Sequence, residues 1–216
     1  MSLLRIKDIS LRINERDILK NINLNVLQKD FIFILGHSGS GKSTLLRICA
    51  SLVGQSDGEI LLNDKSYSEY NPKELRKEIG YIAQEPCLFG ERVRENFEFV
   101  YNIRNMKVDY DRINELLEKF NLSKDYLDKS IDSLSGGQKQ RIAIIRGILV
   151  LPKVLLLDEI TSALDEDNKL IVENIIKDLN ESGVSIIWVT HDISQCERLN
   201  KKCIKIENGK TTKEAC

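Results

Sequence analysis

The stretch Gly36-His37-Ser38-Gly39-Ser40-Gly41-Lys42-Ser43 decides how the rest of this 216-residue chain is interpreted. It matches the pattern G-x-x-x-x-G-K-[ST], follows the apolar run at 31–35 and opens a helical pattern. Glycines between a strand and a helix let consecutive backbone N–H groups point at phosphate oxygens. Lys42 is expected to neutralise the outer phosphates and Ser43 to ligate Mg²⁺, with Thr44 completing the set that binds the nucleotide. The sequence therefore predicts a site for a nucleoside triphosphate.

A second acidic element follows a strand further along the chain. The run Val154-Leu155-Leu156-Leu157 predicts a strand buried on both faces of a parallel sheet, and it ends in Asp158 and Glu159. We expect Asp158 to hold Mg²⁺ at the sheet edge beside the phosphate loop, and Glu159 to act on an attacking water. His191 follows the apolar run at 186–190 and is expected at the same edge, in contact with the γ-phosphate. The alternative is a pair of solvated acids and a structural histidine.

The pentapeptide Leu134-Ser135-Gly136-Gly137-Gln138 offers a second group of backbone N–H groups in front of a helical run at 139–150. A simple turn that caps this helix is the alternative, because serine and glycine are ordinary capping residues. A protein with one phosphate cradle has no obvious use for a second one. Gln84 ends the short strand predicted at 79–83 and by itself indicates only a polar loop residue.

The composition is that of an ordinary globular protein, with 42% hydrophobic and 30% charged residues. A net charge of −1 gives no support for binding nucleic acid or an acidic membrane surface. The N-terminus lacks the apolar core of a signal peptide and no apolar run could span a bilayer, so we expect a cytosolic chain. The five cysteines have neither zinc-ligand nor redox spacing, and two histidines cannot make a His-rich metal site.

Alternating strand and helix patterns predict an α/β sheet core. A charged segment at about 88–131 has helical spacing of Ile113, Leu116, Leu117 and Phe120 and predicts a helical insert. Asn208-Gly209 predicts a hairpin turn. The other predicted strands are 3–6, 18–26, 31–35, 59–62, 154–157, 186–189, 203–206 and 210–212, and the other predicted helices run through 53 and over about 166–181.

Together these motifs resemble the nucleotide-binding subunit of ATP-binding-cassette (ABC) transporters, over nearly the whole chain and in the expected order. Ser162-Ala163-Leu164-Asp165 resembles the family's D-loop, Gln84 its Q-loop glutamine and His191 its switch histidine. The resemblance implies an α/β fold: a P-loop NTPase (RecA-like) core with an N-terminal antiparallel β-subdomain and an inserted α-helical subdomain. It predicts one ATP-binding domain over 1–216, with the core at 1–87 and 139–216 and the helical subdomain at about 88–138.

The resemblance also implies a two-chain ATPase. ATP would induce a homodimer, with each ATP between the phosphate loop of one chain and Ser135, Gly136, Gly137 and Gln138 of the other. Glu159 would act on the water, His191 would stabilise the transition state with Lys42, and Gln84 would ligate Mg²⁺ together with Ser43 and Asp158. A multi-span membrane permease would hold the chain at the cytoplasmic face of the membrane, and no nucleic acid is implied.

Several stretches, among them 83–90 and 152–169, resemble the FetA (YbbL-type) branch, which is linked to iron export. The sequence departs from the family pattern where adenine is expected to bind: the stretch at 11–15 has no aromatic residue to stack on the base, so only Leu11 or Ile13 could give apolar contact.

The alternative functions are a non-transport ABC ATPase coupled to a membrane or regulatory partner, including a division-associated protein, and a generic P-loop kinase. The kinase has no use for the pentapeptide at 134–138.

Overall fold

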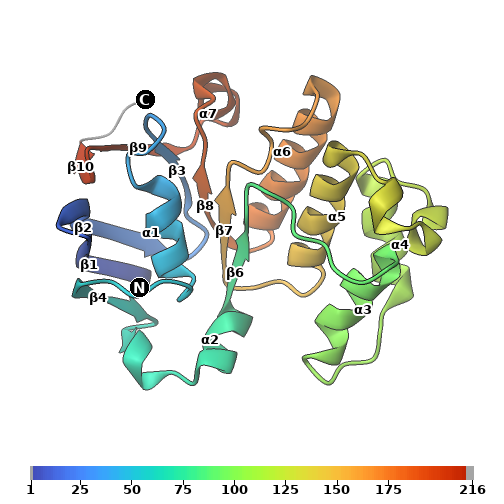
Figure 1. Ribbon diagram of the computed structural model, residues 1–216, viewed down its shortest axis with the longest axis horizontal. Coiled ribbons are helices and arrows are strands. Elements are labelled where there is room, and N and C mark those ends of the chain that lie inside the picture. Colours follow the sequence, from blue (N-terminus) through green and yellow to red (C-terminus); the bar gives the residue numbers. More distant parts are fainter. Residues whose placement is uncertain (1, 213–216) are drawn as a thin grey trace. The chain divides into compact units, whose positions relative to one another are not determined.

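The computed structural model describes residues 2–212 and divides into two compact units (Figure 1). Unit 1 comprises Met1–Tyr81, Pro152–Glu159 and Leu179–Cys216, and unit 2 comprises Ile82–Leu151 and Ile160–Asp178. The helix that follows the pentapeptide therefore belongs to unit 2, whereas the sequence assigned most of it to the core. The predicted subdomain boundaries stay a prediction.

The strands are β1 (Ser2–Ile13), β2 (Arg16–Leu27), β3 (Phe31–Leu35), β4 (Asp57–Leu62), β5 (Lys65–Ser66), β6 (Ile79–Ile82), β7 (Val154–Asp158), β8 (Ser185–Val189), β9 (Lys202–Glu207) and β10 (Lys210–Thr212). The α-helices are α1 (Lys42–Cys49), α2 (Pro72–Glu78), α3 (Val93–Asn102), α4 (Tyr110–Lys119), α5 (Gly136–Ile148), α6 (Glu166–Glu181) and α7 (Ile193–Leu199).

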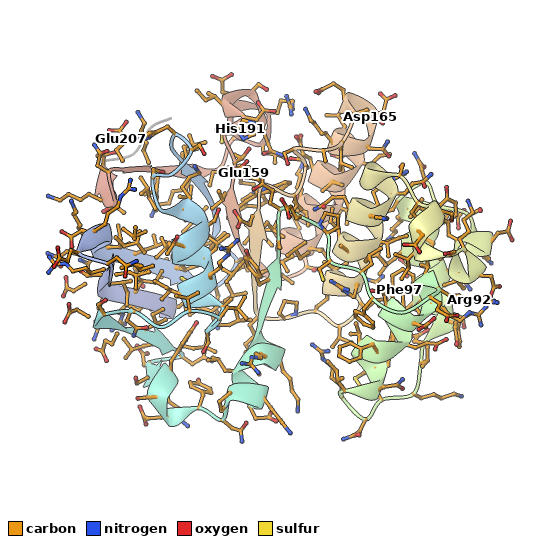
Figure 2. The ribbon with its side chains drawn as sticks, viewed as in Figure 1. Arg92, Phe97, Glu159, Asp165, His191 and Glu207 are labelled. Atoms are coloured by element: carbon orange, nitrogen blue, oxygen red, sulfur yellow. The ribbon has the colours of Figure 1, made fainter. Side chains whose placement is uncertain are left out.

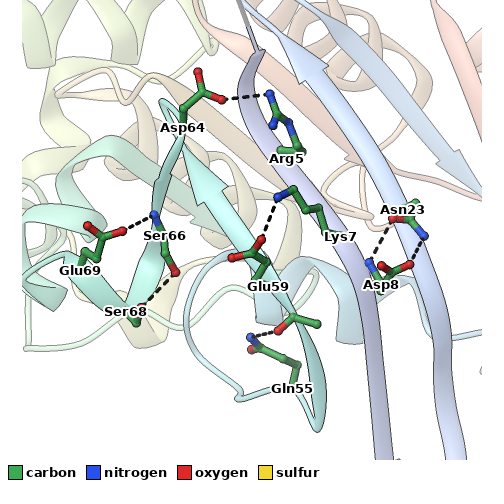
Figure 3. Close-up of polar contacts among 11 residues, drawn as sticks. Arg5, Lys7, Asp8, Asn23, Gln55, Glu59, Asp64, Ser66, Ser68 and Glu69 are labelled. Carbon is green, nitrogen blue, oxygen red and sulfur yellow. Dashed lines mark hydrogen bonds and ion pairs between the residues drawn. The ribbon is translucent and has the colours of Figure 1, made fainter.

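An antiparallel sheet in the order β2-β1-β4-β5 forms the first part of unit 1. Its exposed face carries cross-strand polar pairs, such as Lys7 with Glu59 at 2.8 Å and the Asn23 amide donating to Asp8 at 2.8 Å (Figure 3). Exposed pairs of this kind contribute little to stability. The sheet is instead held by its other face, where Leu4, Ile6 and further alternating residues are buried.

The second sheet of unit 1 has the order β10-β9-β3-β8-β7-β6. Strands β3, β7 and β8 are parallel, and every residue in them is buried, as the continuous apolar runs predict. Because parallel strands end at the same sheet edge, the phosphate loop after β3, the acids after β7 and the polar residues after β8 emerge there together. The α/β fold predicted from the sequence is confirmed.

Unit 2 is built from helices. The residues predicted to line one helical face, Ile113, Leu116, Leu117 and Phe120, are all buried. Helix α5 begins at Gly136, three positions before the predicted start, because the serine in front of it caps the first turn. Helix α1 ends at Cys49 and not near 53, and Ser51 has a left-handed φ of 54°.

Candidate functional site

The phosphate loop leaves β3 through glycines that no other residue could replace without strain. Gly36, Gly39 and Gly41 have φ values of 149°, 78° and 104°. A Cβ built on Gly36 would lie 2.3 Å from the carbonyl oxygen of Ile206 in the adjacent strand β9. The loop therefore packs so closely against the sheet that only glycine fits at its first position.

The first turn of α1 faces this loop without a capping side chain. Gly41 is the N-cap and gives the first turn of the helix no side-chain hydrogen bond. Lys42 is only 5% exposed, and its Nζ donates to the carbonyl oxygens of Gly36 at 2.8 Å and His37 at 3.0 Å. The buried Ser40 hydroxyl has no hydrogen-bond partner among residues 2–212. An uncapped helix start, the Lys42 ammonium bonded to carbonyl oxygens of its own loop, and the Ser40 hydroxyl together fit a phosphate group.

Beside the loop lies a buried carboxylate with both oxygens engaged. Asp158 is 1% exposed, and its Oδ1 accepts a hydrogen bond from the Ser43 hydroxyl at 2.8 Å although the residues are 115 positions apart. Its Oδ2 accepts a hydrogen bond from the Tyr81 hydroxyl at 3.0 Å. A hydroxyl and a carboxylate in contact are hard oxygen ligands of the kind Mg²⁺ prefers, so the residues present fit such an ion.

Sequence patterns missed Tyr81, since a tyrosine in an apolar strand indicates only a core residue. Burial raises the pKa of this phenol above its ordinary value, and it stays protonated at neutral pH. The guanidinium of Arg47 reaches the phenol oxygen at 3.5 Å. No local signal in 79–82 reveals this role, because the partner carboxylate lies 77 residues further along.

The residues after β7 and β8 form a second pair in unit 1. His191 Nδ1 lies 3.0 Å from Glu159 Oε2 (Figure 2). Glu159 has a φ of 47°, a left-handed conformation that costs a residue with a side chain about 1–2 kcal/mol. Its backbone N–H donates to the carbonyl oxygen of Val189 at 3.0 Å. Strain of this kind is typical of residues held for a function.

Unit 2 carries the remaining predicted site residues. Ser135 caps α5: its hydroxyl accepts from the N–H of Gln138 at 3.3 Å, and the side chain of Gln138 accepts from the N–H of Ser135 at 3.0 Å. Gly136 and Gly137 form the first turn. A Cβ on Gly136 would meet no heavy atom of unit 2 within 4 Å, and one on Gly137 would come no closer than 3.5 Å to Leu164. The packing of unit 2 therefore does not require glycine at Gly136.

Two further features of unit 2 concern the Q-loop and D-loop candidates. Gln84 is exposed, two residues after the end of β6. Arg141 of α5 donates to the carbonyl oxygen of Phe120 at 2.8 Å and to the side chain of Asn168 at 2.9 Å. The Asn168 amide in turn donates to both carboxylate oxygens of Asp165 at 2.8 Å. These bonds tie the segment at 162–165 to the helix that begins with the pentapeptide.

Comparison with known proteins identifies the class of protein to which this site belongs. The family model described as "ABC transporter" matches residues 19–162. The chain belongs to the ABC transporter family. It is an ATP-binding subunit with ATPase activity, and the predicted family, function and enzyme class are confirmed. None of the helices within residues 2–212 has the length and apolar character needed to cross a membrane.

Relatives and solved structures agree over almost the whole chain. The chain is 42% identical over 200 residues to the Escherichia coli (strain K12) protein "Probable iron export ATP-binding protein FetA", covering 92% of this chain and 89% of the relative. It is 36% identical over 206 residues to the ergothioneine transport ATP-binding protein EgtV of Helicobacter pylori (strain G27), covering 94% and 96%. A dimeric post-hydrolysis structure of the ATP-binding cassette MJ0796 with ADP and Pi matches with a TM-score of 0.89 and 30% identity, covering 98% and 97%.

Proposed function

We propose that two copies of this chain bind ATP and Mg²⁺ between them and hydrolyse the ATP to drive a separate membrane subunit. Each nucleotide would be held by the loop at 36–44 of one copy and by residues 135–138 of the other. The dimeric state of the solved cassette with ADP and Pi supports this arrangement. The loop and the pentapeptide then form the two halves of one site.

The residues of unit 1 suit hydrolysis. Lys42 is positioned to exchange its two carbonyl partners for phosphate oxygens. Ser43 and Asp158 would hold Mg²⁺, which supplies neutralisation of the phosphate charge. Gln84 stays a predicted ligand of this ion. Glu159 would accept the proton of the attacking water, and His191, whose Nδ1 lies 3.0 Å from this carboxylate, would hold it in place and help to stabilise the transition state at the γ-phosphate.

One observation carries the two-chain proposal: the open space at Gly136. Glycine is a poor helix former, with a cost of about 1 kcal/mol relative to alanine inside a helix. Its φ is not in the left-handed region, and the packing of unit 2 leaves room for a methyl group. A glycine that its own unit does not require is explained if a phosphate group approaches the backbone from outside.

Gly136→Ala tests this explanation. The added methyl group should raise the free energy of unfolding by up to about 1 kcal/mol, because alanine favours the helix and lowers the entropy of the unfolded chain. Binding of ATP to the dilute protein should keep its Kd, and hydrolysis at high protein concentration should fall at least about 100-fold, as for loss of one transition-state donor. Hydrolysis at the wild-type rate would contradict the two-chain site.

Ser135→Asp and Ser135→Asn form a matched pair for the same test. Both side chains are good N-caps, so both variants should fold like the wild type. Only the aspartate places a negative charge where the second copy's triphosphate is expected, so Ser135→Asp should lose hydrolysis and Ser135→Asn should keep far more of it. Equal activities of the two variants would argue against an anion at this position.

We further propose that the transported substrate is a metal ion, and iron in particular, exported through a multi-span permease at the cytoplasmic face of the membrane. The 42% identity to a relative named for iron export supports this substrate. The experiment is co-expression with a multi-span protein encoded next to this chain, followed by measurement of cellular iron with wild type and Glu159→Gln. Iron levels that do not differ between the two would contradict iron export while leaving the ATPase proposal standing.

A further inference from the structure

The Tyr81 hydroxyl donates its hydrogen bond to a functional carboxylate and not to the backbone. Its partner is Asp158 Oδ2, at 3.0 Å, while Asp158 Oδ1 accepts from Ser43 at 2.8 Å. The two partners lie on different oxygens of the same buried carboxylate. The phenol therefore fixes the rotation of the carboxylate and leaves the other oxygen turned toward the phosphate loop.

Two other tyrosines of unit 1 show what an ordinary, partly buried phenol hydroxyl does. The Tyr67 hydroxyl donates to the carbonyl oxygen of Cys49 and the Tyr70 hydroxyl to that of Leu62, both at 2.8 Å. Each of those bonds pairs a phenol hydroxyl with a backbone carbonyl oxygen. Tyr81 differs because its acceptor is a charged side chain, and because Arg47 Nε lies 3.5 Å from the same phenol oxygen. The Arg47 guanidinium, the Tyr81 phenol and the Asp158 carboxylate thus form a hydrogen-bonded chain that ends at Ser43.

We propose that Tyr81 is a positioning residue that holds Asp158 in the orientation needed to bind Mg²⁺ with ATP. The inference rests on the proposed metal site at Ser43 and Asp158. Residues that hydrogen-bond a metal ligand fix its orientation, and their loss typically weakens metal binding about 10- to 100-fold. In this chain Asp158 ends strand β7, and the hydrogen bonds to its Oδ1 and Oδ2 come from other elements, from Ser43 of α1 and Tyr81 of β6.

Tyr81→Phe tests the proposal, since it removes one oxygen atom and keeps the ring. Calorimetry would give the Kd of ATP with excess Mg²⁺ and the Kd of ATP in EDTA, and the ratio of the two is the metal-dependent gain in affinity. We expect this gain to fall about tenfold or more in Tyr81→Phe, with the Kd in EDTA unchanged. Tyr70→Phe is the matched control, because it also loses one partly buried phenol hydrogen bond but should keep the wild-type gain in affinity.

Asp158→Asn in the same assay separates this inference from the proposed function. If Asp158→Asn loses the gain and Tyr81→Phe keeps it, Tyr81 does not position the ligand and the inference is wrong. If Asp158→Asn keeps the wild-type gain, the proposed metal site fails and the inference fails with it. A Tyr81→Phe protein that binds ATP poorly even in EDTA would show a general structural role and would also overturn the inference.

Discussion

His191 Nδ1 lies 3.0 Å from Glu159 Oε2 because β7 and β8 pair in parallel with Asp158 opposite Val189. The two residues are 32 positions apart in the chain. The strand register brings their backbones to the same sheet edge, and the left-handed φ of 47° at Glu159 accompanies the turn out of β7 beside the imidazole. The pair is therefore a consequence of sheet register and one strained residue.

We expect His191→Ala to lower kcat about 100-fold or more with little change in the Kd for ATP, because the imidazole acts on the reacting groups and not on binding. Glu159→Gln should lower kcat at least as far and accumulate an ATP-bound dimer, visible by size-exclusion chromatography. If the two residues act as one unit, the double variant should be hardly slower than Glu159→Gln alone. If the fall in kcat of the double variant in a phosphate-release assay equals the product of the two single falls, the residues act independently.

A graded series of alanine substitutions should separate backbone strain from steric overlap. Gly36 has both a left-handed φ and a carbonyl oxygen 2.3 Å from the position of a Cβ, whereas Gly39 has a φ of 78° and no neighbour within 4 Å. Gly36→Ala should cost more than about 3 kcal/mol and Gly39→Ala about 1–2 kcal/mol. Gly54→Ala is the control, with neither feature, and should be near neutral in urea unfolding. Equal losses for all three would contradict this account.

A double-mutant cycle on Arg141 and Asn168 should detect the link between the pentapeptide helix and the segment at 162–165. Each single alanine variant should destabilise the fold by about 1–3 kcal/mol, because polar partners are left without their bond. The pair shares a 2.9 Å hydrogen bond, so their effects should be non-additive by about 1 kcal/mol in urea unfolding. Arg141→Ala combined with Tyr110→Phe, which shares no hydrogen bond with it, should be additive.

Thiol labelling should distinguish the buried from the exposed cysteines. Burial raises the pKa of Cys49 to about 12, whereas Cys87 is exposed. Thiolate is the reactive form, and with this pKa only about one Cys49 thiol in ten thousand is ionised at pH 8, so Cys49 should react far more slowly than the exposed Cys87. Cys216 lies outside the described residues, so Cys216→Ser is the background for peptide mapping after iodoacetamide. Rapid labelling of Cys49 in the folded protein would contradict its burial.

The strands and the principal helices are predictable because their signals are local. Apolar runs at 31–35 and 154–157, and an Asn-Gly turn at 208–209, each specify structure within a few residues. Helices α2 and α7 do not follow from the sequence pattern, although Asn71 before Pro72 and Asp192 three residues before Gln195 are helix-start signals. The stretches are only seven residues long, too short for a helical period to be evident.

By itself, the sequence determined the phosphate loop, the acids after a buried strand, the pentapeptide and the ABC family, because each is encoded in consecutive residues. Only the tertiary structure decided that Tyr81 holds Asp158, that His191 contacts Glu159, and that unit 2 leaves Gly136 open. Those contacts join residues from separate strands, and a gap beside a glycine depends on what the rest of its unit places there. Neither can be read from a local pattern, because parallel strands are brought together by crossovers and not by proximity in the chain.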